Sequence, residues 1–153
     1  MKIELKNLTP QIALAIKKTA VGMDEIGKVF DEVYAKLMPY LSEQGAQIAG
    51  APYCAYMNCS DDFMVSDMEF GIPVSKALPA KGDLYMSKNC EGKAITTTHK
   101  GPYKALDAAY NALMDYAKDN SLELTGVYYD YYINDPDNTP ESELLTQIVF
   151  PVK

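Results

Sequence analysis

Two stretches of the chain repeat one order of predicted elements, and this repetition limits the fold more than any other feature. Residues 15–20 resemble residues 94–99, and Gly22 then matches Gly101, 79 residues later. Two further matches follow in the same order, namely 50–58 with 126–134 and 68–74 with 146–152. Four matches in one order predict a duplicated strand-helix-strand-strand unit, with repeats at about 11–75 and 83–153.

Hydrophobic periodicity predicts two amphipathic helices, from Asp24 to about Glu43 and from about Tyr103 to Asp119. Pro39 is expected to kink or end the first helix. The apolar stripe of the second helix consists of Leu106, Ala109, Tyr110, Leu113 and Ala117. Strand composition is found at 12–19, 53–58, 65–74, 84–88, 93–99, 127–133 and 144–152.

Two such units can join their sheets and place both helices on one face. The expected fold is therefore one α+β domain over residues 1–153. It would consist of duplicated β-α-β-β units that form an antiparallel sheet, with two main helices on one face and a pseudo-twofold ligand groove on the other.

Composition narrows the class of protein and of partner. The 153 residues are 48% hydrophobic, which is typical of one globular domain with a sizeable core. No apolar run has the length of a bilayer span, and residues 1–6 lack the apolar core of a signal peptide, so we expect a cytoplasmic protein without membrane contact. The net charge of −7, with no basic run, argues against direct binding of nucleic acid.

The cysteines do not indicate a disulfide framework or a metal site. Their number is odd, Cys54 and Cys59 lack a second pair of ligands, and His99 is the single histidine. We therefore expect no metal and no cofactor.

Asp130 lies between two pairs of tyrosines, in a segment whose other residues favour a strand. In an extended chain, alternation places Asp130, Tyr128 and Tyr132 on one face. A carboxylate between two phenol rings suits an aromatic organic cation. The other interpretation is a strand that shows an ordinary polar face to water. Under the predicted repeat, Asp130 corresponds to Cys54 and Tyr132 to Tyr56.

Several motifs together resemble one known family. They are His99-Lys100-Gly101-Pro102-Tyr103 before a helix, the segment 129–136, Thr146-Gln147-Ile148 running into Pro151, and the segment 67–74 in the first half. In order and spacing they are similar to the GyrI-like small-molecule-binding domain, which also forms the effector-binding half of multidrug-responsive transcription activators. The resemblance implies a pseudo-twofold antiparallel sheet with two helices, and a groove for bulky, flat, often cationic compounds.

The resemblance also implies which residues contact the ligand. The acid of the family usually lies in a Glu-x-Tyr pattern, and the matching positions are Asp130 and Tyr132, where the acid is shorter by one methylene. Glu69 is expected on the strand face away from the helix, where it either assists Asp130 or is a solvated charge. The candidate ligand-binding residues are Asp130, Tyr132, Tyr128, Glu69, Tyr56, Cys54 and Tyr103.

The favoured function is a stand-alone binding protein for amphipathic, aromatic, cationic small molecules, which would sense or sequester them. One alternative is a hydrolase of reactive electrophiles that uses a groove acid and a tyrosine, although no nucleophile-base pair supports catalysis. The other is an interaction protein of the gyrase-inhibitor type with an unknown protein partner. A DNA-binding regulator in the same chain is not expected, because the duplicated unit fills about 11–152 and leaves no room for a helix-turn-helix.

Overall fold

The computed structural model describes residues 2–153 and confirms the predicted α+β class, with antiparallel strands and two helices. Its strands are β1 (Glu4–Leu8), β2 (Ile12–Gly22), β3 (Tyr53–Met57), β4 (Val65–Pro73), β5 (Tyr85–Lys88), β6 (Gly92–Lys100), β7 (Tyr128–Tyr132) and β8 (Leu145–Pro151). The helices are α1 (Ile26–Glu43) and α2 (Asp107–Asp119), and short 3-10 turns cover Met23–Glu25, Tyr103–Ala105 and Glu141–Glu143.

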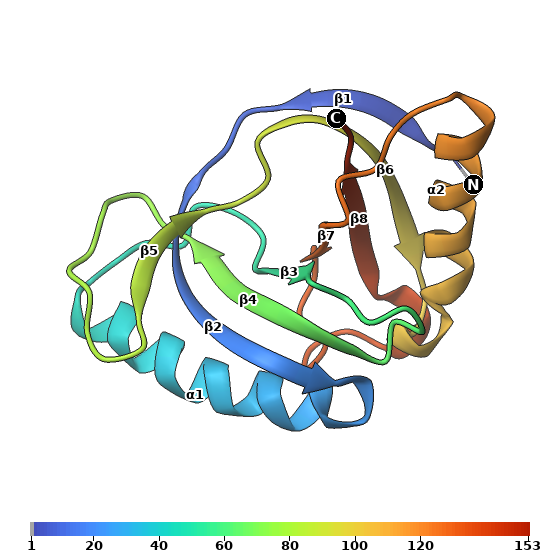
Figure 1. The fold of residues 1–153 in the computed structure, drawn as a ribbon. Helices are drawn as coiled ribbons and strands as arrows, with labels where there is room; N and C mark the ends of the chain where they lie inside the picture. Colours follow the sequence, from blue (N-terminus) through green and yellow to red (C-terminus); the bar gives the residue numbers. More distant parts are fainter. Residues whose placement is uncertain (1) are drawn as a thin grey trace. The chain divides into compact units, whose positions relative to one another are not determined.

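The chain divides into two units. The N-terminal unit is Pro10–Asn89, and the C-terminal unit is Cys90–Lys153 together with the residues up to Thr9. The strand order is β3-β4-β2-β5 in the N-terminal unit and β1-β6-β8-β7 in the C-terminal unit. Each unit contains a long strand followed by a helix and two strands, β2-α1-β3-β4 and β6-α2-β7-β8, and one further strand, β5 or β1, completes its four strands (Figure 1).

In the N-terminal unit, α1 covers one face of the sheet. Val33 and Leu37 have no exposed surface, and the ring of Phe30 meets the ring of Phe70 edge to face at 4.9 Å. Burial of each apolar side chain of this size stabilises the folded state by about 1.5–3 kcal/mol. Alternation along β4 therefore places Phe70, Met68 and Ile72 under the helix.

In the C-terminal unit, α2 packs on its sheet through the stripe predicted from the sequence. The buried cluster contains Ile95, Leu106, Ala109, Leu113, Ala117, Ile148, Phe150 and Val152. The side of β8 that carries Ile148 and Phe150 is therefore the face that α2 covers.

Helix α1 reaches Glu43 as predicted, so Pro39 lies inside the helix and does not end it. Two local features differ from expectation. β2 continues past Thr19 to Gly22, across a bulge where Ala20 has a φ of 52° and donates its backbone N–H to Asp67 Oδ1 at 2.8 Å. β1 was not predicted, because its alternating charged residues resemble a solvated tail, but it pairs with β6 as an edge strand.

Among residues 2–153, no helix combines the length and the apolar character needed to cross a bilayer.

Candidate functional site

Asp130 is the buried acid of the C-terminal unit. It lies in the middle of β7 opposite Ile148 of β8, and its side chain is 1% exposed. Its Oδ2 accepts a hydrogen bond of 2.6 Å from the hydroxyl of Tyr110, which belongs to α2. The carboxylate therefore points towards the helix.

This placement corrects one expectation. Asp130 was expected on the groove face, which carries no helix, but the β7–β8 register puts it on the same face as Ile148, under α2. Alternation correctly grouped Asp130 with Tyr128 and Tyr132, yet it does not say which face a helix covers. That information comes from the strand register.

Aromatic rings surround this acid on two sides. On one side, the rings of Tyr110 and Tyr128 lie 5.4 Å apart, and both contact the ring of Phe150, at 6.2 and 5.5 Å. On the other side, Tyr103 meets Tyr132 edge to face at 5.7 Å. The structure thus brings four predicted residues into one unit, and we call Asp130, Tyr103, Tyr110, Tyr128 and Tyr132 the Asp130 cluster.

The electrostatics of the Asp130 cluster are negative. Burial, followed by the charges of Asp135 and Asp130, raises the pKa of Tyr103. The phenol of Tyr103 is therefore neutral at physiological pH and lies within the field of the neighbouring carboxylates. Such a field favours a cation over an anion or a phosphate.

Thr146 adds a buried polar atom to the same face. It pairs with Tyr132 across β7 and β8 and has no exposed surface. Its Oγ1 has no hydrogen-bond partner in the described part of the chain. Because buried hydroxyls are normally hydrogen-bonded, this atom offers a polar contact to an incoming group.

The three predicted residues of the N-terminal unit do not share one location. Cys54 and Tyr56 pair with Phe70 and Met68 and are 0% and 4% exposed, so they lie under α1. Glu69 lies on the opposite face, as predicted, and it is partly exposed. It accepts hydrogen bonds from the hydroxyls of Tyr53, Tyr85 and Ser87.

Tyr110 and the three hydroxyl donors to Glu69 were not predicted as site residues. Tyr110 follows the apolar period of its helix and was assigned to the core, although its hydroxyl is the atom that meets Asp130. Tyr85 and Ser87 alternate correctly along a predicted strand, but β5 has to be paired with β2 before they come near Glu69. A search for tyrosines on the same faces as the acids could have found them.

No group of three histidine, cysteine, aspartate or glutamate side chains within residues 2–153 is arranged to hold a metal ion.

Comparisons with known proteins agree with the fold. The sequence model of the GyrI-like small molecule binding domain matches residues 1–153. The C-terminal domain of EcmrR has a TM-score of 0.81 at 24% identity, and the match covers 99% of this chain and 97% of that chain. The match covers only 57% of the longer EcmrR chain in its complex with DNA.

Two more distant structures share the architecture. SAV2435, solved with bound tetraphenylphosphonium, has a TM-score of 0.65 at 15% identity, over 100% of this chain and 94% of that chain. A hydrolase encoded by lin2189 from Listeria innocua has a TM-score of 0.67 at 13% identity, over 99% and 92% of the two chains. None of the curated proteins matches the sequence significantly.

Proposed function

Because the chain belongs to the family of GyrI-like small molecule binding domains, we propose that it binds amphipathic, aromatic, cationic compounds at the Asp130 cluster. The observation that carries this proposal is a carboxylate with 1% exposure that lies among tyrosine rings, on a strand where an acid is disfavoured. Reversible binding of such compounds would serve sensing or sequestration.

Burial explains why Asp130 would select a cation. A carboxylate taken out of water loses hydration, and the hydroxyl of Tyr110 donates to it at 2.6 Å. A ligand cation would supply the opposite charge in a medium of low dielectric constant, and the faces of the surrounding rings attract cations as well. Charge and ring recognition therefore act together.

A ligand would reach Asp130 by displacing the ring of Tyr103. Tyr103 is 37% exposed, whereas Asp130 beneath it is buried, and it lies on a three-residue 3-10 turn rather than in α2. Gly101, just before this turn, has a φ of 131°, which only glycine adopts readily. In this proposal the ring of Tyr103 swings outwards, and the ligand takes its place against Tyr132.

The proposal can be tested by calorimetric titration with tetraphenylphosphonium, the cation bound by SAV2435, and with neutral triphenylphosphine oxide. Asp130→Asn keeps the shape of the side chain and removes its charge. We expect it to weaken binding of the phosphonium ion by at least about tenfold, since a charge contact in a buried site is worth more than 1.4 kcal/mol. Binding of the oxide should change by less than about threefold.

Asp115→Asn is the matched control, because it makes the same change in net charge at an exposed position of α2. It should leave both affinities unaltered. Equal losses for the cation and the neutral compound in Asp130→Asn would contradict recognition of charge at this site.

A further inference from the structure

Glu69 occupies the centre of the N-terminal sheet on the face away from α1, and three side chains hold its carboxylate. Oε1 accepts hydrogen bonds from the Tyr53 hydroxyl at 3.0 Å and from Ser87 Oγ at 2.9 Å. Oε2 accepts one from the Tyr85 hydroxyl at 2.6 Å. We call these four residues the Glu69 cluster. Its donors come from β3 and β5, so the arrangement depends on the whole sheet.

Small residues make this arrangement possible. Gly71 lies directly across from Tyr53 and from Ala15, and a Cβ atom on Gly71 would collide with the phenol ring of Tyr53. The ring therefore lies over a backbone without a side chain, and its hydroxyl reaches Glu69. Ala55 faces Glu69 on the other side and adds no bulk.

The carboxylate retains room for one more donor. A carboxylate has about four acceptor positions, two on each oxygen. Two hydroxyls occupy those on Oε1, whereas Tyr85 is the one donor within residues 2–153 that reaches Oε2. Because Glu69, Tyr85 and Ser87 are partly exposed, a group from outside can approach the remaining position on Oε2.

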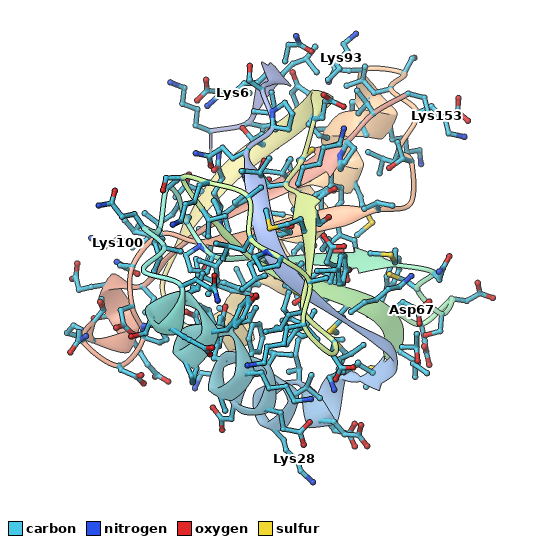
Figure 2. The ribbon with its side chains drawn as sticks, turned by 90° about the vertical axis from the view of Figure 1, so that its left-hand side faces the viewer. Lys6, Lys28, Asp67, Lys93, Lys100 and Lys153 are labelled. Atoms are coloured by element: carbon cyan, nitrogen blue, oxygen red, sulfur yellow. The ribbon has the colours of Figure 1, made fainter. Side chains whose placement is uncertain are left out.

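The neighbouring charges do not occupy that position. Lys17 lies opposite Glu69 on β2 and is exposed. Asp67 lies two residues before Glu69 on the same face, and hydrogen bonds from Asn58 and from the backbone of Ala20, together with the charge of Lys17, lower its pKa. The charge of Lys17 thus acts on Asp67, and Figure 2 shows Asp67 beside β4 at the surface of the unit.

The geometry points to the Glu69 cluster as a second binding site, for small primary ammonium ions that carry an aromatic ring. The N–H of the ammonium group would donate to Oε2, and the ring would lie against Tyr85. This chemistry differs from that of the Asp130 cluster, where a buried carboxylate among rings suits a cation without N–H groups. The inference does not depend on ligand binding at Asp130.

A matched pair of probes tests this difference. Benzylammonium and benzyltrimethylammonium share the ring and the charge, but only the first can donate hydrogen bonds. We expect the intact chain to bind benzylammonium several-fold more tightly in calorimetric titrations. Glu69→Gln should reduce that affinity by about tenfold, as expected for the loss of a charge-assisted hydrogen bond.

Two further variants serve as controls, one for the loss of a charge and one that retains Glu69. Asp67→Asn removes a charge from the same face and should change the affinity by less than about twofold. Tyr85→Phe keeps the ring but frees a second position on Oε2, so it should bind benzylammonium at least as tightly as the unaltered chain. Because it retains Glu69, it remains informative if Glu69→Gln does not fold.

Titration of Glu69→Gln with tetraphenylphosphonium distinguishes the proposed site at Glu69 from the one at Asp130. If the second site is separate, this variant binds the phosphonium ion as the unaltered chain does, whether or not Asp130 recognises charge. Equal losses of affinity for the two ammonium probes in Glu69→Gln, or unaltered benzylammonium binding in that variant, would overturn the inference. A loss of benzylammonium binding in Tyr85→Phe would also overturn it.

Discussion

The two units follow one order of strand, helix and two strands, but they place an acid and its tyrosines on opposite kinds of face. In the C-terminal unit, Asp130 lies beneath a helix and accepts from Tyr110 of that helix. In the N-terminal unit, Glu69 lies on the face without a helix and accepts from three hydroxyls. One arrangement of elements can therefore hold a carboxylate either buried or within reach of solvent.

The comparison extends to the positions that face the helices. Cys54 pairs with Phe70, and Asp130 pairs with Ile148, and each of these partners lies three residues before a proline. Cys54 therefore stands where the other unit has Asp130. This correspondence supports the duplication of about 11–75 and 83–153 that we propose, and the two units differ in the polarity of this residue under their helices.

The largest expected effect tests whether Phe70 and Ile148, which pack under the two helices, contribute similarly to the stability of the fold. Phe70→Ala should lower the free energy of unfolding by about 3–5 kcal/mol, and Ile148→Ala by about 2–5 kcal/mol, because each leaves a cavity under its helix. Denaturant unfolding followed by circular dichroism measures both losses. A loss below about 1 kcal/mol at either position would show that its helix does not pack as described.

A smaller effect is expected from removing a tyrosine donor, and it should lower stability more at Asp130 than at Glu69. Tyr110→Phe removes a donor from a carboxylate with 1% exposure and should cost about 1–3 kcal/mol, since the acid cannot turn to water. Tyr53→Phe removes one of three donors from the partly exposed Glu69 and should cost about 0.5–1.5 kcal/mol. The same unfolding experiment compares them, and a reversed order would mean that Glu69 depends more on its tyrosine than Asp130 does.

The smallest effect concerns a surface acid and depends on pH. Asp67 has a folded-state pKa below its usual 3.8, first because Asn58 donates to it and then because the Ala20 backbone does. A lowered pKa contributes stability above the unfolded value, and this stability disappears as the pH falls through the folded value. Asp67→Asn should therefore be slightly less stable than the unaltered chain at pH 7, with a difference that vanishes towards pH 2.

Thermal unfolding across this pH range measures the difference between the two chains. Asp61→Asn, in the neighbouring loop, serves as the charge-matched control. A difference that grows as the pH falls would contradict the assigned sign.

Much of the fold could be predicted because its signals are local. The period of α1 predicted a helix from Asp24, and the structure has a 3-10 turn at Met23–Glu25 followed by Ile26–Glu43. Alternation along the segment 127–133 correctly grouped the side chains of β7. Both patterns depend only on neighbouring residues, so one sequence is enough to read them.

The site was harder to predict because it depends on contacts between distant segments. The face of Asp130 follows from its register with Ile148, and the donors of Glu69 come together only when β5 pairs with β2. Tyr110 shows the same limit, because an apolar period does not reveal where the polar end of a tyrosine points. Strand β1 was not predicted, because the charged residues of this edge strand are also typical of a solvated tail.

Strand connectivity has a consequence for dissecting the chain. All four strands of the N-terminal unit lie within the continuous segment Pro10–Asn89, whereas the C-terminal unit takes its edge strand β1 from the other end of the sequence. A cut after Asn89 would leave the second fragment with the edge of β6 uncovered, and such an edge recruits other strands. The first fragment therefore carries all the strands of its unit on one polypeptide, but the second requires a peptide containing Glu4–Leu8, supplied in trans or joined by a linker to its own end.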